Sequence, residues 1–285
     1  MIAMKLGIRA PAGDMVVFPY AGAYAWHISH HDFPAPPSPA ALSAGREVFG
    51  LINSLPLPLM TEMVGYAGFD FVILDLEHVG VNPQTLENMI RAAECAGTTA
   101  VVRVPWAAPD IILRVLDAGA QGIVVPHVCS PAVAQLAVDS TRYHPLGTRG
   151  IAGGRTTGFG TLALPSHFER ANRELIVVAM IEDQEGVDAI EEIIAVPGID
   201  MVLEGAIDLS QSLGVPADAQ HPSVQAAIRR IAQACQACDV PFCAIPRAAG
   251  QCEHWRERGV RAFLLGDDRA TAFRAMKQLV ADYRR

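Results

Sequence analysis

Lysine is almost absent from this chain of 285 residues, which contains only Lys5 and Lys277. Enzymes that form an imine with their substrate, and pyridoxal-phosphate enzymes, need a lysine buried at the site. Lys5 lies in an irregular N-terminal segment, and Lys277 falls on the polar side of the last expected helix. The sequence therefore predicts an enzyme with no Schiff-base lysine and no pyridoxal phosphate.

Basic residues and long apolar runs are also scarce. Twenty-two lysines and arginines stand against 30 acidic residues, for a formal net charge of −8. This balance argues against nucleic acid as a partner, because binding to phosphates requires a basic surface. No apolar run reaches the roughly 18–20 residues of a membrane helix. The apolar stretch 15–26 is interrupted by Pro19 and lacks a basic leader. We therefore expect a cytoplasmic protein with no membrane segment.

Cysteine is limited to six scattered residues. In a cytoplasmic chain these thiols are expected to be reduced. Cys235 and Cys238 have the spacing of a zinc or redox motif, but they lie inside a helical apolar pattern. Because residues three apart share one helix face, we interpret both as structural.

The first 40 residues differ from the remainder. They lack periodicity and end in the proline-rich stretch 33–39, which is typical of a linker. We predict a poorly ordered N-terminal extension over 1–40 and one catalytic domain over 41–285. Three histidines in the extension are expected to be solvated rather than metal ligands: His27, His30 and His31.

From residue 47 onward, short apolar runs alternate with amphipathic helical stretches. Runs rich in Val, Ile and Leu are what parallel strands buried on both faces require. Asn82-Pro83 and Ser130-Pro131 are helix starts, and Gly97 and Gly119 are helix ends. The expected strands are 48–53, 69–76, 99–104, 122–126, 175–181, 200–204, 241–245 and 262–265. Eight strands, each followed by a helix, predict a single-domain α/β (β/α)8 TIM barrel, with a doubly wound sheet as the alternative.

Ionisable residues stand where several of these strands end. In such barrels the carboxyl ends of the strands carry the active site, and burying unpaired charge there is costly. Glu182 and Asp208 offer hard oxygen ligands for Mg²⁺ or Mn²⁺. Arg103 can bind a 2-oxo acid and stabilise an enolate oxygen. His78 is the candidate general acid/base, with Asp75 or Glu77 to orient it.

Each of these residues has a simpler interpretation. A single Arg, Glu or His at a strand end is most often part of a structural ion pair. Four compatible groups on successive strand ends favour a site instead. His127, after the fourth strand, is given no role. The other histidines of the barrel domain are interpreted as surface residues: His144, His167, His221 and His254.

Residues 40–285 also resemble a known family. The segments on which the resemblance rests are 68–78 (GFDFVILDLEH), 101–105 (VVRVP), 116–126 (LDAGAQGIVVP) and 143–150 (YHPLGTRG). They are similar to the HpcH/HpaI aldolases, divalent-metal-dependent class II enzymes that act through a pyruvate enolate. The resemblance implies that His78 is the acid/base histidine and Arg103 the substrate-binding arginine. It also implies that Glu182 and Asp208 bind the metal.

Three other segments, 153–160, 179–186 and 204–214, resemble the siderophore-pathway branch of this family, the citrate synthases of staphyloferrin B biosynthesis. The resemblance implies condensation of oxaloacetate with acetyl-CoA to citrate and CoA, and leaves open whether the divalent cation is required. Gly205 is expected at the substrate site with Arg103, Glu182 and Asp208. Arg149 and Arg155 are candidates for contact with CoA phosphates.

Two other functions remain open from the sequence. One is a metal-dependent aldolase that cleaves 4-hydroxy-2-oxo acids to pyruvate and an aldehyde. The other is a non-catalytic barrel that serves as a binding or assembly subunit. We expect a small-molecule 2-oxo acid as substrate, and a homo-oligomer.

Overall fold

The computed structural model describes residues 46–284. The predicted extension 1–40, its three histidines and Lys5 lie outside the described residues. No helix in the described part of the chain is both long and apolar enough to cross a membrane.

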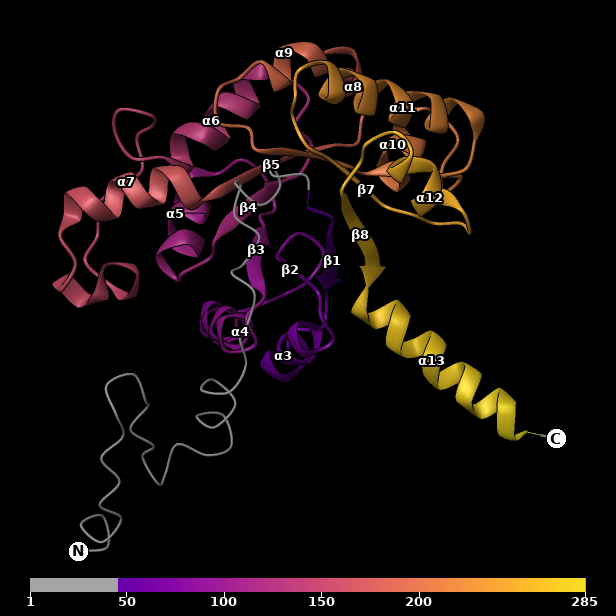
Figure 1. Cartoon of the computed structure of the whole chain (residues 1–285), viewed down its shortest axis with the longest axis horizontal. Coiled ribbons are helices and arrows are strands. Elements are labelled where there is room, and N and C mark those ends of the chain that lie inside the picture. The colour runs from indigo at the N-terminus through magenta and orange to yellow at the C-terminus, as the bar shows by residue number, and fades with distance from the viewer. Residues whose placement is uncertain (1–45, 285) are drawn as a thin grey trace, which may run out of the picture.

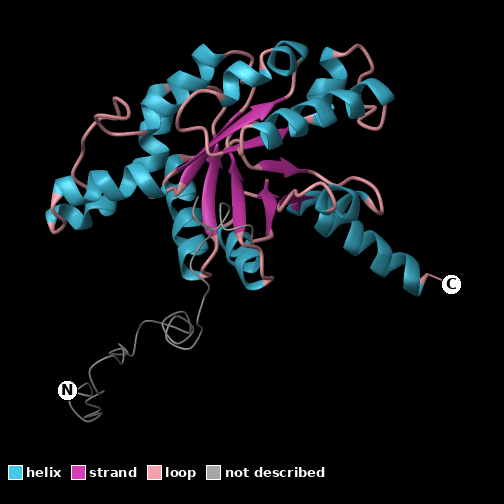
Figure 2. Cartoon of the chain, turned by 45° about the horizontal axis from the view of Figure 1, so that its top comes forward, coloured by secondary structure: helices cyan, strands magenta, loops and turns pink. Residues whose placement is uncertain are grey.

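Eight parallel strands close into a barrel in sequence order, as predicted (Figures 1 and 2). They are β1 (Val48–Asn53), β2 (Phe71–Asp75), β3 (Thr99–Arg103), β4 (Gly122–Val125), β5 (Ile176–Ile181), β6 (Met201–Glu204), β7 (Phe242–Ala244) and β8 (Ala262–Asp267). Closure between β1 and β8 confirms the TIM barrel and excludes the doubly wound open sheet.

Helices surround the strands (Figure 2). They are α3 (Pro58–Tyr66), α4 (Pro83–Cys95), α5 (Pro109–Asp117), α6 (Pro131–Thr141), α7 (Leu164–Glu174), α8 (Gln184–Asp188), α9 (Ile190–Ile194), α10 (Ala206–Ser212), α11 (Pro222–Ala237), α12 (Gln251–Arg256) and α13 (Asp268–Tyr283), with the 3₁₀ helix η2 (Arg155–Gly160). The predicted starts are confirmed: Asn82 and Ser130 cap α4 and α6 by accepting backbone N–H groups, and proline follows each cap.

Alternate residues of each strand face two different parts of the core. In β2, Phe71 and Ile73 pack inside the barrel, whereas Val72 and Leu74 pack against the helices. Because side chains alternate across a strand, a run of apolar residues fills both layers. Cys235 of α11 belongs to the outer layer, whereas Cys238, at the end of the helix, is exposed. The expectation that the two thiols share one face of the helix in the core therefore holds for Cys235 only.

Strand register brings the ionisable strand ends together. Asp75 pairs in register with Arg103, and Ile181 pairs with Glu204. Residues from β2 to β6 therefore reach the same mouth of the barrel, the carboxyl-terminal end. α13 instead runs away from the barrel to the C-terminus (Figure 1).

Candidate active site

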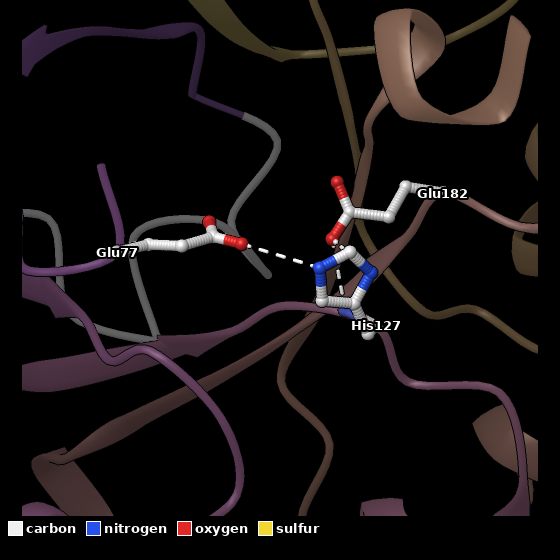
Figure 3. A group of neighbouring side chains, drawn as sticks. All are labelled: Glu77, His127 and Glu182. Carbon is white, nitrogen blue, oxygen red and sulfur yellow. Dashed lines mark hydrogen bonds and ion pairs between the residues drawn. The ribbon is translucent and has the colours of Figure 1, made fainter. Parts of the chain in front are cut away.

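Three side chains meet at the carboxyl-terminal end of the barrel: Glu77 after β2, His127 after β4 and Glu182 after β5. The imidazole lies between the two carboxylates (Figure 3). Its Nε2 is 3.3 Å from Glu77 Oε1, and its Nδ1 is 3.3 Å from Glu182 Oε1. One donor atom from each residue lies within 4.8 Å of the others. We refer to Glu77, His127 and Glu182 as the acid–histidine cluster.

Glu182 is the most deeply buried member of the cluster, with 2% of its surface exposed. Burial raises the pKa of its carboxyl to about 7, and the charges of Glu77 and Asp208 add to this rise, whereas contacts with His127 oppose it. Oε1 accepts the backbone N–H of His127 at 2.8 Å. Oε2 is buried and has no hydrogen-bond partner among the described residues. Such an atom costs free energy unless a ligand contacts it.

His127 takes a backbone conformation that side chains seldom adopt, with φ of +52°. Such backbone strain is often found at functional sites, where surrounding contacts maintain it. Here the N–H bond to Glu182 stabilises the turn that directs the imidazole into the site. No role for His127 was predicted from the sequence. Its position just after the buried strand β4, at the end of the barrel that carries the active site, could have indicated a role.

Arg103 lies at the end of β3 and is held by two carboxylates. Its Nε and Nη2 contact the two carboxylate oxygens of Asp75 at 3.0 and 2.9 Å. Its Nη1 is 3.0 Å from Glu77 Oε2. Asp75 is 1% exposed and Arg103 is 7% exposed. Arg103 is therefore a fixed cation next to the acid–histidine cluster, and Glu77 connects the two.

His78, the predicted acid/base residue, lies at the edge of this arrangement. Its side chain is more than half exposed, and its Nε2 is 3.7 Å from Glu77 Oε2. Of the two expected neighbours, Glu77 adjoins the imidazole, whereas Asp75 contacts only the backbone: the His78 N–H donates to Asp75 Oδ1 at 3.4 Å. The structure thus brings His78 near the site but puts His127, not His78, between the carboxylates.

Asp208 and Gly205 both lie near Glu182. Asp208, on α10, is exposed and close enough for its charge to raise the pKa of Glu182, although it lies outside the three-residue cluster. Gly205 packs directly on Glu182: a Cβ at this position would lie 2.4 Å from Glu182 Oε2. Glycine at 205 therefore makes room for the carboxylate in its observed position.

Glu204, a buried acid at the end of β6, is paired with Arg247. Arg247 donates to both carboxylate oxygens, at 2.6 and 3.0 Å. The backbone N–H groups of Ala206 and Ile245 also donate to Glu204. Burial nevertheless raises the pKa of Glu204. No local motif marked Arg247 in the sequence, because its partner lies on another strand end.

Arg149 and Arg155, the candidate contacts for CoA phosphates, lie elsewhere. Arg149 is buried and pairs with Asp117 at 2.8 Å. Arg155 donates to both carboxylate oxygens of Glu94. Asp117 ends α5, which leads into β4, and Glu94 lies at the end of α4, which leads into β3. The Arg149–Asp117 and Arg155–Glu94 pairs therefore lie toward the amino-terminal end of the barrel. This position argues against contact with a CoA that enters at the acid–histidine cluster.

The residues present fit a divalent cation. Asp75, Glu77, Glu182 and Asp208 supply four carboxylates, and within residues 46–284 Arg103 is the one guanidinium that pairs with any of them, contacting Asp75 and Glu77. A site this acidic would repel a 2-oxo acid unless a cation offset the charge. The unpartnered Oε2 of Glu182, an oxygen of Glu77 and a ring nitrogen of His127 are donors that Mg²⁺ or Mn²⁺ accepts.

Comparison with known proteins decides the family. The model of the HpcH/HpaI aldolase/citrate lyase family matches residues 49–275, which is most of the chain. The chain belongs to this family. Family members catalyse the formation or cleavage of carbon–carbon bonds, and this HpcH/HpaI protein is such an enzyme. The resemblance noted in the sequence is thereby confirmed.

Three relatives illustrate the range within the HpcH/HpaI family. The crystal structure of citrate synthase SbnG is 41% identical, covers 86% of this chain and 96% of its own, and has a TM-score of 0.80. The 5-keto-4-deoxy-D-glucarate aldolase of Escherichia coli K12 is 36% identical over 85% of this chain and 94% of its own. The HpcH/HpaI aldolase from Desulfitobacterium hafniense DCB-2 is 30% identical, with 85% and 95% coverage and a TM-score of 0.80.

Proposed function

We propose that this enzyme is a citrate synthase of the siderophore-pathway type, which condenses oxaloacetate with acetyl-CoA. The observation that carries the proposal is Arg103, a buried cation next to the acid–histidine cluster. Such a group can bind a 2-oxo acid and stabilise an enolate oxygen. The similarity to citrate synthase SbnG over 86% of the chain supports this substrate pair.

The reaction needs a base, an anion-binding group and water. A base removes a proton from the methyl group of acetyl-CoA, and the resulting enolate carbon attacks the ketone carbon of oxaloacetate. The ketone oxygen takes up a proton and becomes the hydroxyl of citrate. Water then cleaves the thioester, so that citrate and CoA leave. His78 is our candidate for the proton transfers because it is exposed at the mouth and adjoins Glu77.

Four residues are assigned to cation binding. Glu182 and Asp208 are the predicted ligands, and Glu77 and His127 complete the set that the geometry favours. When bound, a divalent cation would supply Lewis acidity toward a carbonyl oxygen. Gly205 keeps the space that the Glu182 carboxylate occupies, and Arg103 supplies the permanent positive charge.

The second candidate is a metal-dependent aldolase that cleaves a 4-hydroxy-2-oxo acid. Its support is the 36% identity to the 5-keto-4-deoxy-D-glucarate aldolase of Escherichia coli and the cation-binding character of the cluster. This reaction releases pyruvate and consumes no thioester. A non-catalytic barrel would bind ligands and turn over neither substrate set.

One experiment separates these functions. Purified full-length protein is incubated with oxaloacetate and acetyl-CoA, free thiol is followed, and citrate is identified by mass spectrometry. A parallel assay offers 5-keto-4-deoxy-D-glucarate and measures pyruvate. Thiol release that depends on both substrates, with stoichiometric citrate, supports the synthase. Pyruvate release without citrate formation would overturn it in favour of the aldolase. Each assay is repeated with EDTA and then with added Mg²⁺ or Mn²⁺.

The predicted homo-oligomer is supported by α13. This helix projects from the barrel (Figure 1). Large apolar side chains are exposed along it: Phe273, Met276, Leu279, Val280 and Tyr283. Such a face is unfavourable in water, and a second copy of the chain can cover it. Light scattering should show a mass above that of the 30.4 kDa protomer, and Leu279→Asp should lower it. A monomeric parent protein would refute this part of the proposal.

A further inference from the structure

An apolar groove of about 530 Å³ lies between α4 and α5, on the outer side of the barrel. These two helices follow β2 and β3, the strands that lead to Glu77 and Arg103. The groove is lined by buried Leu86 of α4, by buried Val115 of α5 and by half-buried Ile111 of α5. Its volume and its apolar lining are typical of a small-ligand site.

One end of the groove adjoins the acid–histidine cluster. Leu76 lines the groove and directly precedes Glu77 of the cluster, and Val81 lines it farther along the same loop. Leu76 packs against the outer layer of the core, whereas Glu77 contacts His127 on the inner side. The groove and the site therefore lie on the two sides of one loop. A flexible chain that passes over this loop can reach both.

The opposite end of the groove carries an exposed aromatic ring. Phe159 of η2 and Ala118, which follows α5, line this end. Phe159 is 83% exposed, and its φ of +55° lies in the left-handed region that side chains seldom adopt. Its backbone N–H donates to the Gly154 carbonyl at 2.8 Å and stabilises this conformation. Such strain is often found at ligand sites, and an exposed planar ring can stack on a nucleobase.

Two arginines line the groove between these ends, Arg91 on α4 and Arg114 on α5. Their ion pairs, with Glu87 and Asp110, join exposed residues four positions apart in one helix. Such exposed pairs contribute little to stability, so a phosphate group can replace either carboxylate.

The third arginine of the groove, Arg155, has no such freedom. Both of its Nη groups donate to Glu94, and Nη1 also donates to the Ala118 carbonyl. Asp117, which lines the groove as well, is paired with buried Arg149. The two guanidinium groups with exchangeable partners are therefore those of Arg91 and Arg114.

We propose that this groove binds the CoA part of acetyl-CoA, an inference that rests on the proposed synthase reaction. The pyrophosphate binds Arg114, the phosphate on the ribose binds Arg91, and the adenine stacks on Phe159. The pantetheine arm runs along the apolar lining and passes over the loop at Leu76 and Val81. The acetyl group thereby reaches the acid–histidine cluster from the outer side of the barrel.

The length of the pantetheine arm fits this arrangement. Arg114 lies five residues after the first residue of α5, roughly 7–8 Å along the helix at about 1.5 Å per residue. The arm has about twelve bonds between its sulfur and the pyrophosphate, as many as four extended residues, and therefore spans roughly 14 Å. About half of this length is left to cross the loop at Leu76 and bring the acetyl group to the cluster.

The first test measures binding apart from turnover. Titration calorimetry of the full-length protein, at constant ionic strength, gives the Kd for CoA and for adenosine 3′,5′-bisphosphate, the nucleotide part of CoA that lacks the arm. Arg114→Gln and Phe159→Asn, in which asparagine tolerates the positive φ, should each raise both Kd values at least tenfold. Ile151→Asn and Arg173→Gln are the matched controls, because they change an exposed apolar residue and an exposed, paired arginine outside the groove. Both controls should leave the Kd values within twofold.

The second test uses the citrate assay with the same variants, each checked for folding by circular dichroism. Arg114→Gln and Phe159→Asn should raise the KM for acetyl-CoA at least tenfold and leave the KM for oxaloacetate within twofold, because they remove contacts far from the reacting atoms. The inference is overturned, with the proposed function intact, if the parent makes citrate and both groove variants keep its Kd and KM values. A parent that neither binds CoA nor makes citrate overturns the proposed function, and this inference with it.

Discussion

Replacement of Glu182 by glutamine should make the metal-free protein more stable at alkaline pH while it removes activity. The Glu182 carboxyl is buried, and burial raises its pKa from 4.5 to about 7. A group with a raised folded-state pKa contributes full stability below its unfolded pKa and loses it as the pH rises through the folded value. Ionisation of Glu182 therefore costs stability between pH 4.5 and about 7.

The size of this effect follows from the pKa. One pKa unit is worth about 1.4 kcal/mol, so a rise from 4.5 to about 7 corresponds to about 3 kcal/mol. Most of this lies between pH 5 and pH 8. Glutamine keeps an oxygen that can accept the His127 N–H and carries no charge. In Glu182→Gln the pH-dependent loss should therefore be absent.

The assay is urea unfolding of the EDTA-treated parent and variant at pH 5 and pH 8. We expect the variant to gain about 2–3 kcal/mol relative to the parent between these two pH values, or roughly 4–12 °C in Tm for a domain of this size. Glu185→Gln serves as the control, because it removes the same charge from an exposed position. Equal pH dependence in the parent and in Glu182→Gln would refute the reasoning.

A cation should reverse the order of stability. Added Mn²⁺ at pH 8 should raise the Tm of the parent, because binding to the folded state alone is stabilising. The same addition should raise the Tm of Glu182→Gln much less, since a ligand has lost its charge. A Tm increase of the same size in both proteins would show that Glu182 is not a ligand of the cation.

The remaining predictions concern five other positions. Arg103→Ala should lower kcat/KM at least 100-fold. It should also lower the free energy of unfolding by about 3–5 kcal/mol, because it leaves Asp75 buried without its partner. Unchanged urea unfolding would contradict the effect on stability. Gly205→Ala should lower kcat about 100-fold with the fold retained by circular dichroism, because the added Cβ displaces the Glu182 carboxylate; near-parental kcat would show that Glu182 tolerates the shift. Arg247→Met should destabilise the protein by about 3 kcal/mol at pH 8, because it leaves the Glu204 carboxylate buried without its partner. The loss should be smaller at pH 5, where Glu204 is more readily protonated. A destabilisation that is the same at both pH values would contradict a role for the Glu204 charge. The Lys5→Arg, Lys277→Arg double variant should keep full activity, and borohydride added during turnover should trap no covalent adduct; a trapped adduct would end the argument against an imine.

The eight strands could be predicted because each is a short, continuous apolar run. A parallel strand inside a barrel is buried on both faces, so nearly every residue must be apolar, and that requirement is visible in the local sequence. β1 has the expected bounds, and the other seven strands differ from the expected ranges by one or two residues at one or both ends. The largest differences are at β2, which begins two residues later than expected, and at β8, which ends two residues later. Helix starts such as Asn82-Pro83 could also be predicted from the local sequence, because the Asn82 side chain accepts a hydrogen bond from the backbone N–H three residues later.

The sequence by itself also determined which residues could do chemistry, because Arg103 and Glu182 interrupt apolar runs at strand ends. Only the tertiary structure decided how they combine. It put His127 between Glu77 and Glu182, held Arg103 on Asp75 and paired Glu204 with Arg247. It also buried His167, so the prediction that this histidine is a surface residue was wrong. These contacts join residues up to 55 positions apart in the chain. Their geometry depends on barrel closure and strand register, which no local pattern contains.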